Sequence, residues 1–247
     1  MNVIFHGEIV EYDFIDNKRD KTILFLHGWG GNKNSFIQTQ NLLKNDFNIF
    51  SLTMPTIEPT NLSWNLFDYQ NLILSILKIY NIENVIIICH SFGFRVACLL
   101  KDFVTIKAIV VTGGAGLKDN NFLKRISRNQ NKILYNNKRF KFLHNDLMSR
   151  DYKSLPIINK ISFKNIVNFN SKNLSKFDCP LLLFWGKNDK ETKLKFAKYL
   201  YKKNRAKLIV TKGDHFTYLT DNALFNYDQT LHVLPSLHLQ ERSCRHR

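Results

Sequence analysis

The chain has 247 residues, of which 44% are hydrophobic, and it carries a formal net charge of +16 at pH 7. This length suits one α/β domain with room for an inserted subdomain, and the hydrophobic content excludes a disordered chain. No apolar run approaches the length of a transmembrane helix, and the N-terminal residues lack the pattern of a signal peptide. We therefore expect a cytoplasmic protein without membrane insertion.

The positive charge is concentrated in two segments. Residues 118–176 carry a net charge of +11 and residues 190–212 a net charge of +8, whereas the rest of the chain is slightly acidic. The sequence contains no RNA-binding or helix-turn-helix motif, so we expect no nucleic-acid partner. The charge of the first segment predicts either attraction of anionic substrates or a surface that merely faces solvent, and the sequence leaves both open.

Along the first half of the chain, apolar runs alternate with helical patterns. Residues 3–14 alternate in polarity and predict an exposed antiparallel edge strand. The continuous apolar run within residues 21–28 predicts a central strand that is buried on both faces. Residues 47–55 predict a further strand, and residues 63–80 predict a helix with Ser63 as its N-cap.

The second half continues this alternation. Residues 85–89 predict a buried strand, followed by a sharp turn at Ser91 and a helix, and strands are predicted within residues 106–116, 179–189 and 206–215. The alternation predicts an α/β protein with a mostly parallel, doubly wound sheet.

The strand–helix rhythm is interrupted between two parts of a predicted core. Residues 1–117 and 177–229 form this core, and residues 118–176 contain no clear strand, which predicts an inserted helical lid. Residues 230–247 contain no Lys, Asn or Ile, unlike the rest of the chain. This tail is predicted to be foreign to the fold, with a genuine final helix as the alternative.

The segment Cys-His-Ser-Phe-Gly at residues 89–93 is close to G-x-S-x-G, the pattern of a serine nucleophile at a strand-to-helix turn. Cys89 replaces the first glycine, and we expect it to fit because the facing residue, Gly93, is small. A serine hydroxyl needs a base, and the base needs an acid to orient it. Asp189 and His215 follow later strands in the expected order, with Asp119 as the alternative acid.

The glycine-rich segment His-Gly-Trp-Gly-Gly at residues 27–31 follows a predicted central strand. Such a loop can present the backbone N–H of Trp29 beside that of Phe92 and so bind a developing oxyanion. We expect His27 to support this loop and His90 to be a structural hydrogen-bonding residue. The four cysteines show neither C-x-x-C pairs nor zinc spacing, so we expect reduced thiols, no metal and no cofactor.

These segments, taken together, resemble the α/β-hydrolase superfamily, in particular its lid-bearing bacterial members. The matching stretches are FLHGWGGNKNSF, VIIICHSFGFRVA, VVTGGAGLK, LLLFWGKND and KGDHFTYL. The resemblance implies Ser91 as nucleophile, Asp189 as acid, His215 as base, and the amides of Trp29 and Phe92 as an oxyanion hole.

The sequence therefore predicts a serine hydrolase that cleaves a small carboxylic ester or related acyl compound through an acyl-enzyme. Two alternatives remain: a carbon–carbon bond hydrolase or lyase with the same residues, and a non-catalytic ligand-binding protein with this fold. The expected partner is a small-molecule acyl substrate, and the oligomeric state is left open.

Overall fold

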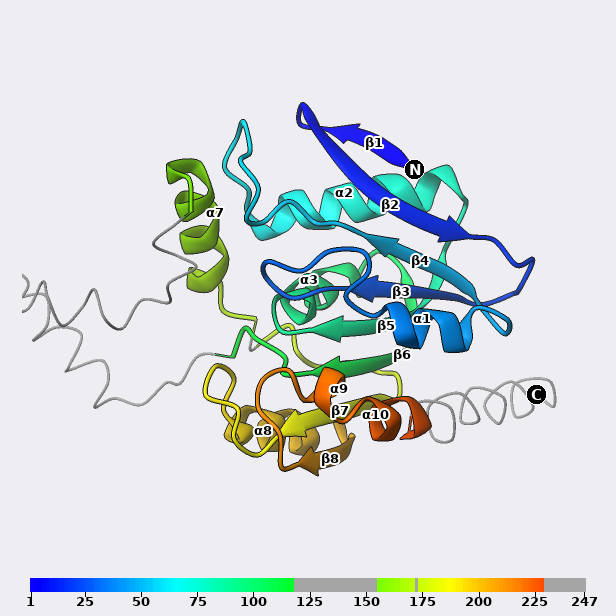
Figure 1. The fold of residues 1–247 in the computed structure, drawn as a ribbon, viewed down its shortest axis with the longest axis vertical. Helices are drawn as coiled ribbons and strands as arrows, with labels where there is room; N and C mark the ends of the chain where they lie inside the picture. Colours follow the sequence, from blue (N-terminus) through cyan, green and yellow to red (C-terminus); the bar gives the residue numbers. More distant parts are fainter. Residues whose placement is uncertain (118–154, 172, 229–247) are drawn as a thin grey trace, which may run out of the picture.

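The computed structural model describes residues 1–117, 155–171 and 173–228, which form a sheet covered by helices (Figure 1). The described strands are β1 (Asn2–Phe5), β2 (Glu8–Ile15), β3 (Thr22–Leu26), β4 (Asn48–Leu52), β5 (Asn84–His90), β6 (Thr105–Thr112), β7 (Leu181–Gly186) and β8 (Lys207–Thr211). They lie in the order β1-β2-β4-β3-β5-β6-β7-β8. The pairs β1–β2 and β2–β4 are antiparallel, and the pairs that follow across the sheet are parallel.

Helices cover both faces of this sheet. Alternate side chains of each central strand point to opposite faces, and because these side chains are apolar on both faces, both must be covered. The described helices are α1 (Ile37–Leu43), α2 (Leu66–Ile79), α3 (Phe92–Leu100), α7 (Ile157–Asn168), α8 (Leu194–Asn204), α9 (Thr217–Thr220) and α10 (Asn222–Asp228). Leu24 and Leu26 of β3 pack on the face covered by α2, α3 and α8, whereas Ile23 and Phe25 pack on the face covered by α1, α9 and α10. The predicted class, a mostly parallel doubly wound sheet, is confirmed.

The predicted single edge strand over residues 3–14 is wrong in detail. The structure has a hairpin of β1 and β2 instead, with His6 and Gly7 at its turn. These residues have φ values of 53° and 77°, as expected for a two-residue hairpin turn. The alternation of polarity continues through the turn, so the pattern alone did not reveal it.

The predicted N-cap of α2 is also wrong, because the cap is Asn65 and not Ser63. The Asn65 side chain accepts a hydrogen bond from the N–H of Phe67 (2.8 Å), and the Asn65 N–H donates to the Asp68 carboxylate (2.7 Å). This reciprocal arrangement satisfies two backbone donors that the first turn of a helix otherwise leaves unpaired.

The predicted lid is described only in part. Residues 118–154 and 172, and the end of the chain from residue 229, lie outside the described residues. The helix α7 belongs to the predicted lid, but the boundaries of the lid and the nature of the tail at residues 230–247 remain predictions. In the described part of the chain, no helix is both long enough and apolar enough to cross a membrane.

Two glycines allow backbone segments to approach closely at the carboxyl ends of the strands. A Cβ on Gly93, in the first turn of α3, would lie 2.2 Å from the carbonyl oxygen of Leu26. A Cβ on Gly186, at the end of β7, would lie 2.1 Å from the carbonyl oxygen of Asp214. Both separations are far shorter than a van der Waals contact, so the packing of α3 on β3 and of β7 on the loop after β8 requires glycine.

Replacing Gly93 with alanine should lower the free energy of unfolding by about 3 kcal/mol, because the added methyl group meets a backbone oxygen that cannot move aside. The loss is expected even though alanine favours a helix over glycine by about 1 kcal/mol. Urea denaturation measures the change.

Gly7→Ala is the matched control, because a Cβ there would have no atom within 4 Å and would meet only the strain of a positive φ. That strain costs about 1 kcal/mol. Equal losses in the two variants, or no loss in Gly93→Ala, would contradict the steric explanation.

Candidate active site

Ser91 lies at the sharp turn between β5 and α3. Its φ of 46° and ψ of −108° fall outside the regions that residues with a side chain ordinarily adopt, so the turn is strained. The Ser91 N–H donates to the carbonyl oxygen of Thr112 (3.0 Å). The Ser91 carbonyl oxygen accepts from the N–H groups of Phe94 (3.1 Å) and Ala115 (3.0 Å). These three hydrogen bonds hold the serine at the carboxyl end of β5.

Asp189 and His215 form a hydrogen-bonded pair in the loops that follow β7 and β8. Nδ1 of His215 lies 2.9 Å from Oδ2 of Asp189, whose side chain is fully buried. Burial alone would raise the pKa of Asp189, but hydrogen bonds from His215 and Thr192 outweigh it and hold that pKa below its ordinary value of 3.8. An ionised carboxylate at Nδ1 favours the tautomer with the proton on Nδ1, which leaves Nε2 able to accept a proton.

Thr192 is a member of the site that the sequence analysis missed. Its hydroxyl lies 2.8 Å from Oδ2 of Asp189 and 2.9 Å from the carbonyl oxygen of Gly113. The N–H groups of Thr192 and Glu191 both donate to Oδ1 of Asp189. Aspartate often accepts such bonds from backbone groups two or three residues later, so the Asp-x-x-Thr pattern was an available signal. Thr192 fixes the carboxylate and connects the β7 loop with the segment after β6.

Ser91 and His215 both contact the short segment that follows β6. A Cβ on Gly113 would lie 2.9 Å from Nδ1 of His215, and Ser91 is hydrogen-bonded to the backbone on both sides of that glycine. Within the residues that the structure describes, the Ser91 hydroxyl makes no hydrogen bond with His215. Such bonds are often long in the absence of ligand and tighten when one binds.

His90, the residue before the serine, packs against His215 with 4.6 Å between the ring centroids. Nδ1 of His90 lies 3.0 Å from the carbonyl oxygen of Thr112, so the ring donates a hydrogen bond there. Burial and the neighbouring His215 lower the pKa of His90 to about 3. His90 is therefore a neutral structural hydrogen-bonding residue, as predicted, and its ring packs against that of His215.

The loop after β3, which carries Trp29, lies against the turn that carries Ser91 and Phe92. A Cβ on Gly28 would lie 3.5 Å from Cβ of Ser91, so this loop is in contact with the turn. Among the described residues, neither the N–H of Trp29 nor that of Phe92 has a hydrogen-bond acceptor. Phe92 begins α3, where the positive end of the helix dipole adds to the attraction for an anion.

His27 supports this loop through hydrogen bonds from its buried ring. Its Nδ1 lies 2.6 Å from the carbonyl oxygen of Gly28, and its Nε2 accepts from the N–H of Met54 (2.8 Å). A neutral imidazole can donate and accept at once, which matches these two partners. Burial lowers the pKa of His27 to about 4, which keeps the ring neutral.

Arg95, one turn into α3, connects the helix that follows Ser91 with α7. Its Nη1 donates to the carbonyl oxygens of Ile166 (2.9 Å) and Phe169 (2.7 Å). Ile166 lies in the last turn of α7, where its carbonyl oxygen also accepts from the N–H of Phe169 (3.2 Å), and Phe169 is the C-cap residue. The guanidinium therefore lies at the negative end of the helix dipole. Burial lowers the pKa of Arg95 to about 10, so it stays charged at neutral pH. Figure 1 shows α7 at the end of the sheet toward which the parallel strands point.

Cys89 is fully buried in β5, and burial raises the pKa of its thiol, so it is an unreactive core residue. Its Sγ lies 3.5 Å from the carbonyl oxygen of Val110. The backbone that approaches Gly93 belongs to Leu26. The expectation that Gly93 makes room for Cys89 stays a prediction.

Two other aspartates are Asp214, which precedes His215 in the sequence, and Asp119, the alternative acid. Asp214 is exposed, and its carboxylate accepts from the N–H of Phe216 (2.8 Å). Asp119, the alternative acid, lies outside the described residues.

Comparisons with known proteins define the fold. No family model matches the chain. The chain is 23% identical over 260 residues to the uncharacterized hydrolase YugF of Bacillus subtilis strain 168, which covers 93% of this chain and 89% of that protein. The esterase EaEST of Exiguobacterium antarcticum superposes with a TM-score of 0.70 at 14% identity, covering 94% of this chain and 98% of the other.

A further solved structure is MGS-MChE2, an alpha/beta hydrolase enzyme from the metagenome of sediments of the Mar Chica lagoon in Morocco. It superposes with a TM-score of 0.66 at 21% identity, covering 95% of this chain and 96% of the other. The chain thus has the α/β-hydrolase fold, as the sequence predicted.

The stability of the protein should fall on mild acidification, because His27 and His90 are neutral in the folded state. Their pKa values of about 4 and about 3 lie below the ordinary value of 6.5. A lowered folded-state pKa gives stability that is fully present above pH 6.5 and is lost as the pH falls toward that pKa. Between pH 7.5 and 5, urea denaturation should show a loss of about 2 kcal/mol for each imidazole.

Two variants test the source of this loss. His27→Gln should be less stable at pH 7.5 but should lose about half of the pH dependence, whereas His6→Gln, at an exposed position, should keep all of it. The lowered pKa of Asp189 adds almost nothing in this window, because the stability it contributes is lost mainly as the pH falls below its ordinary value of 3.8. A wild-type stability that is flat from pH 7.5 to 5 would contradict the prediction.

Proposed function

We propose that the protein is a serine hydrolase that cleaves a small carboxylic ester or related acyl compound. The observation that carries this proposal is a convergence at one end of the sheet: a strained serine, a hydrogen-bonded Asp–His pair and two N–H groups without an acceptor in the described chain. Acyl transfer requires a nucleophile, an oriented base and donors for the oxyanion, and each group meets one of these requirements.

In the proposed reaction, Nε2 of His215 accepts the hydroxyl proton of Ser91 as Oγ bonds to the carbonyl carbon of the ester. The Asp189 carboxylate stabilises the resulting imidazolium and itself remains ionised. The N–H groups of Trp29 and Phe92 bind the negative carbonyl oxygen of the tetrahedral intermediate. The intermediate then expels the alcohol, which takes the proton from His215, and an acyl-enzyme remains on Ser91.

Water completes the cycle. His215 accepts a proton from a water molecule as its oxygen bonds to the acyl carbon, and the second intermediate releases the acid while His215 returns the proton to Ser91. The scheme uses only residues of this chain and water.

The names of the similar proteins support a hydrolytic reaction. EaEST is named an esterase, YugF a hydrolase and MGS-MChE2 an alpha/beta hydrolase enzyme. Because the identities are 14%, 23% and 21%, we infer the reaction from the site of this chain rather than from theirs.

The alternatives make different demands on the same residues. A ligand-binding protein has no need of a buried carboxylate that orients a histidine beside a strained serine, so this geometry favours an enzyme. A carbon–carbon bond hydrolase or lyase would use the same residues but would release no alcohol. Labelling of Ser91 by a fluorophosphonate probe identifies an activated serine, and release of alcohol from p-nitrophenyl esters of varied acyl length identifies an esterase.

Ser91→Ala, His215→Ala and Asp189→Asn should each lower kcat for p-nitrophenyl butyrate by about 10³-fold or more, because each removes one part of a cooperating unit. The Ser91→Ala/His215→Ala double variant should be no slower than Ser91→Ala alone. Circular dichroism checks that each variant is folded.

Matched controls remove the same chemical group elsewhere. Ser75→Ala, on α2, and Asp178→Asn, in the segment before β7, should keep wild-type kcat, and so should Asp119→Asn. If Asp119→Asn abolished turnover while Asp189→Asn retained it, the acid would have to be reassigned. Full activity in Ser91→Ala would overturn the proposal as a whole.

A further inference from the structure

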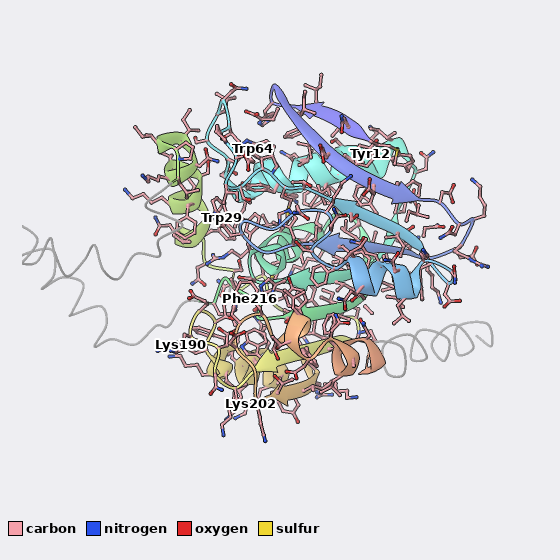
Figure 2. All side chains as sticks on the ribbon, in the orientation of Figure 1. Tyr12, Trp29, Trp64, Lys190, Lys202 and Phe216 are labelled. Atoms are coloured by element: carbon pink, nitrogen blue, oxygen red, sulfur yellow. The ribbon has the colours of Figure 1, made fainter. Side chains whose placement is uncertain are left out.

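A cavity of about 860 Å³ lies beside the candidate site, between the loop after β3 and the loop after β8. Trp29 lines it from the first loop and Phe216 from the second, and Figure 2 shows both side chains at the end of the sheet where α7 lies. His90 is also part of its lining. A second cavity, of about 930 Å³, lies at the opposite end of the sheet, near the start of β5 and β6, and is remote from Ser91.

The position of the first cavity indicates which part of an ester it receives. In the proposed reaction, the carbonyl oxygen points toward the Trp29 N–H, and the alcohol leaves toward Nε2 of His215, which protonates it. The cavity borders Trp29 on one side. On the other side it borders His90 and Phe216, whose rings lie 4.6 Å and 5.3 Å from the ring of His215. The cavity therefore adjoins the path of the departing alcohol.

The lining of this cavity is largely apolar and carries one charge. Phe216 and Leu219 are each 51% exposed and Ile57 is 40% exposed, so the cavity has apolar surface that a ligand can cover. Among the described lining residues, Glu58 has the only charged side chain, and none of them is Lys or Arg. This is unexpected in a chain with a net charge of +16.

The backbone that carries Glu58 is fixed by α7. Nδ2 of the buried Asn159 donates to the carbonyl oxygens of Glu58 (2.7 Å) and Thr56 (2.8 Å). One helical turn later, the Ser162 hydroxyl accepts from the N–H of Trp64 (2.8 Å). The segment between β4 and α2 is thus attached to α7 at two points, which keeps Glu58 at the wall of the cavity.

We propose that this cavity holds the alcohol part of the substrate and selects an uncharged or cationic alcohol over an anionic one. This inference rests on the proposed function. An anionic alcohol would meet the Glu58 carboxylate and no Lys or Arg of the described lining, whereas a cationic one would meet that carboxylate and the aromatic rings of Trp29 and Phe216. The positive net charge of the whole protein would favour an anionic alcohol, whereas the lining of the cavity favours an uncharged or cationic one. The two effects therefore predict different substrate preferences.

Three butyrate esters with alcohols of similar size test the proposal: 3,3-dimethylbutyl butyrate, which is neutral, butyrylcholine, which is cationic, and 3-sulfopropyl butyrate, which is anionic. We expect kcat/KM for the first two to exceed that for the third by about tenfold or more. Glu58→Gln should lower the value for butyrylcholine about threefold, raise that for the anionic ester about threefold and leave the neutral ester unchanged.

Two controls separate the cavity from general effects of charge. Glu83→Gln makes the same change in net charge at the opposite end of the sheet, and it should leave all three values unchanged. Methyl butyrate and methyl hydrogen succinate place the charge difference on the acyl part instead. Glu58→Gln should leave the ratio of kcat/KM for these two esters unchanged.

Each outcome bears on the proposal. If the neutral ester is hydrolysed but the anionic ester is hydrolysed as well or better, the selection by the cavity is overturned while the serine hydrolase remains. A response to Glu58→Gln that appears in the methyl ester pair would assign the cavity to the acyl part and overturn the assignment to the alcohol. Failure to hydrolyse any ester, together with no labelling by fluorophosphonate, would remove the proposed function and this inference with it.

Discussion

The strained backbone conformation of Ser91 is maintained by its place between β5 and α3 and by hydrogen bonds to α3, to the end of β6 and to the segment after β6. A residue in such a conformation costs about 1–3 kcal/mol, which the surrounding hydrogen bonds and packing must offset. The absence of a side chain on Gly93 lets α3 approach the carbonyl oxygen of Leu26, at the end of β3. The loop with Trp29 continues from β3, so this approach places that loop next to the turn that carries Ser91 and Phe92.

The three histidines around this turn show that environment, more than residue type, determines what a side chain can do. His27 and His90 are fully buried, face backbone carbonyls and have lowered pKa values, so they serve as neutral supports. His215 alone faces an ionised carboxylate, that of Asp189, and its side chain is 11% exposed. His90 packs against His215 and His27 holds the loop after β3, so His215 is the histidine of the three to which we assign proton transfer.

Much of this arrangement was predictable from the sequence because central strands buried on both faces read as continuous apolar runs, and the residues just after them gather at one end of a parallel sheet. The sequence signals failed where structure depends on local turns or on contacts distant in sequence. The hairpin at His6 was hidden because polarity keeps alternating through it. The Thr192 hydroxyl is hydrogen-bonded to the carbonyl oxygen of Gly113, 79 residues away in the sequence. The carbonyl oxygen of Glu58 accepts from Asn159, 101 residues away.

The helix α7 contacts both α3, which follows Ser91, and the segment that carries Glu58. Through Arg95 it is attached to the helix that begins behind the serine, and through Asn159 it is attached to the segment that carries Glu58. The sequence analysis predicts a lid that includes this stretch, and the described contacts attach α7 to the core near both of its ends. The helix α7 therefore contacts both α3 and the segment that forms one side of the neighbouring cavity. The alcohol selection that we propose and the position of Ser91 at the start of α3 are therefore both linked to α7.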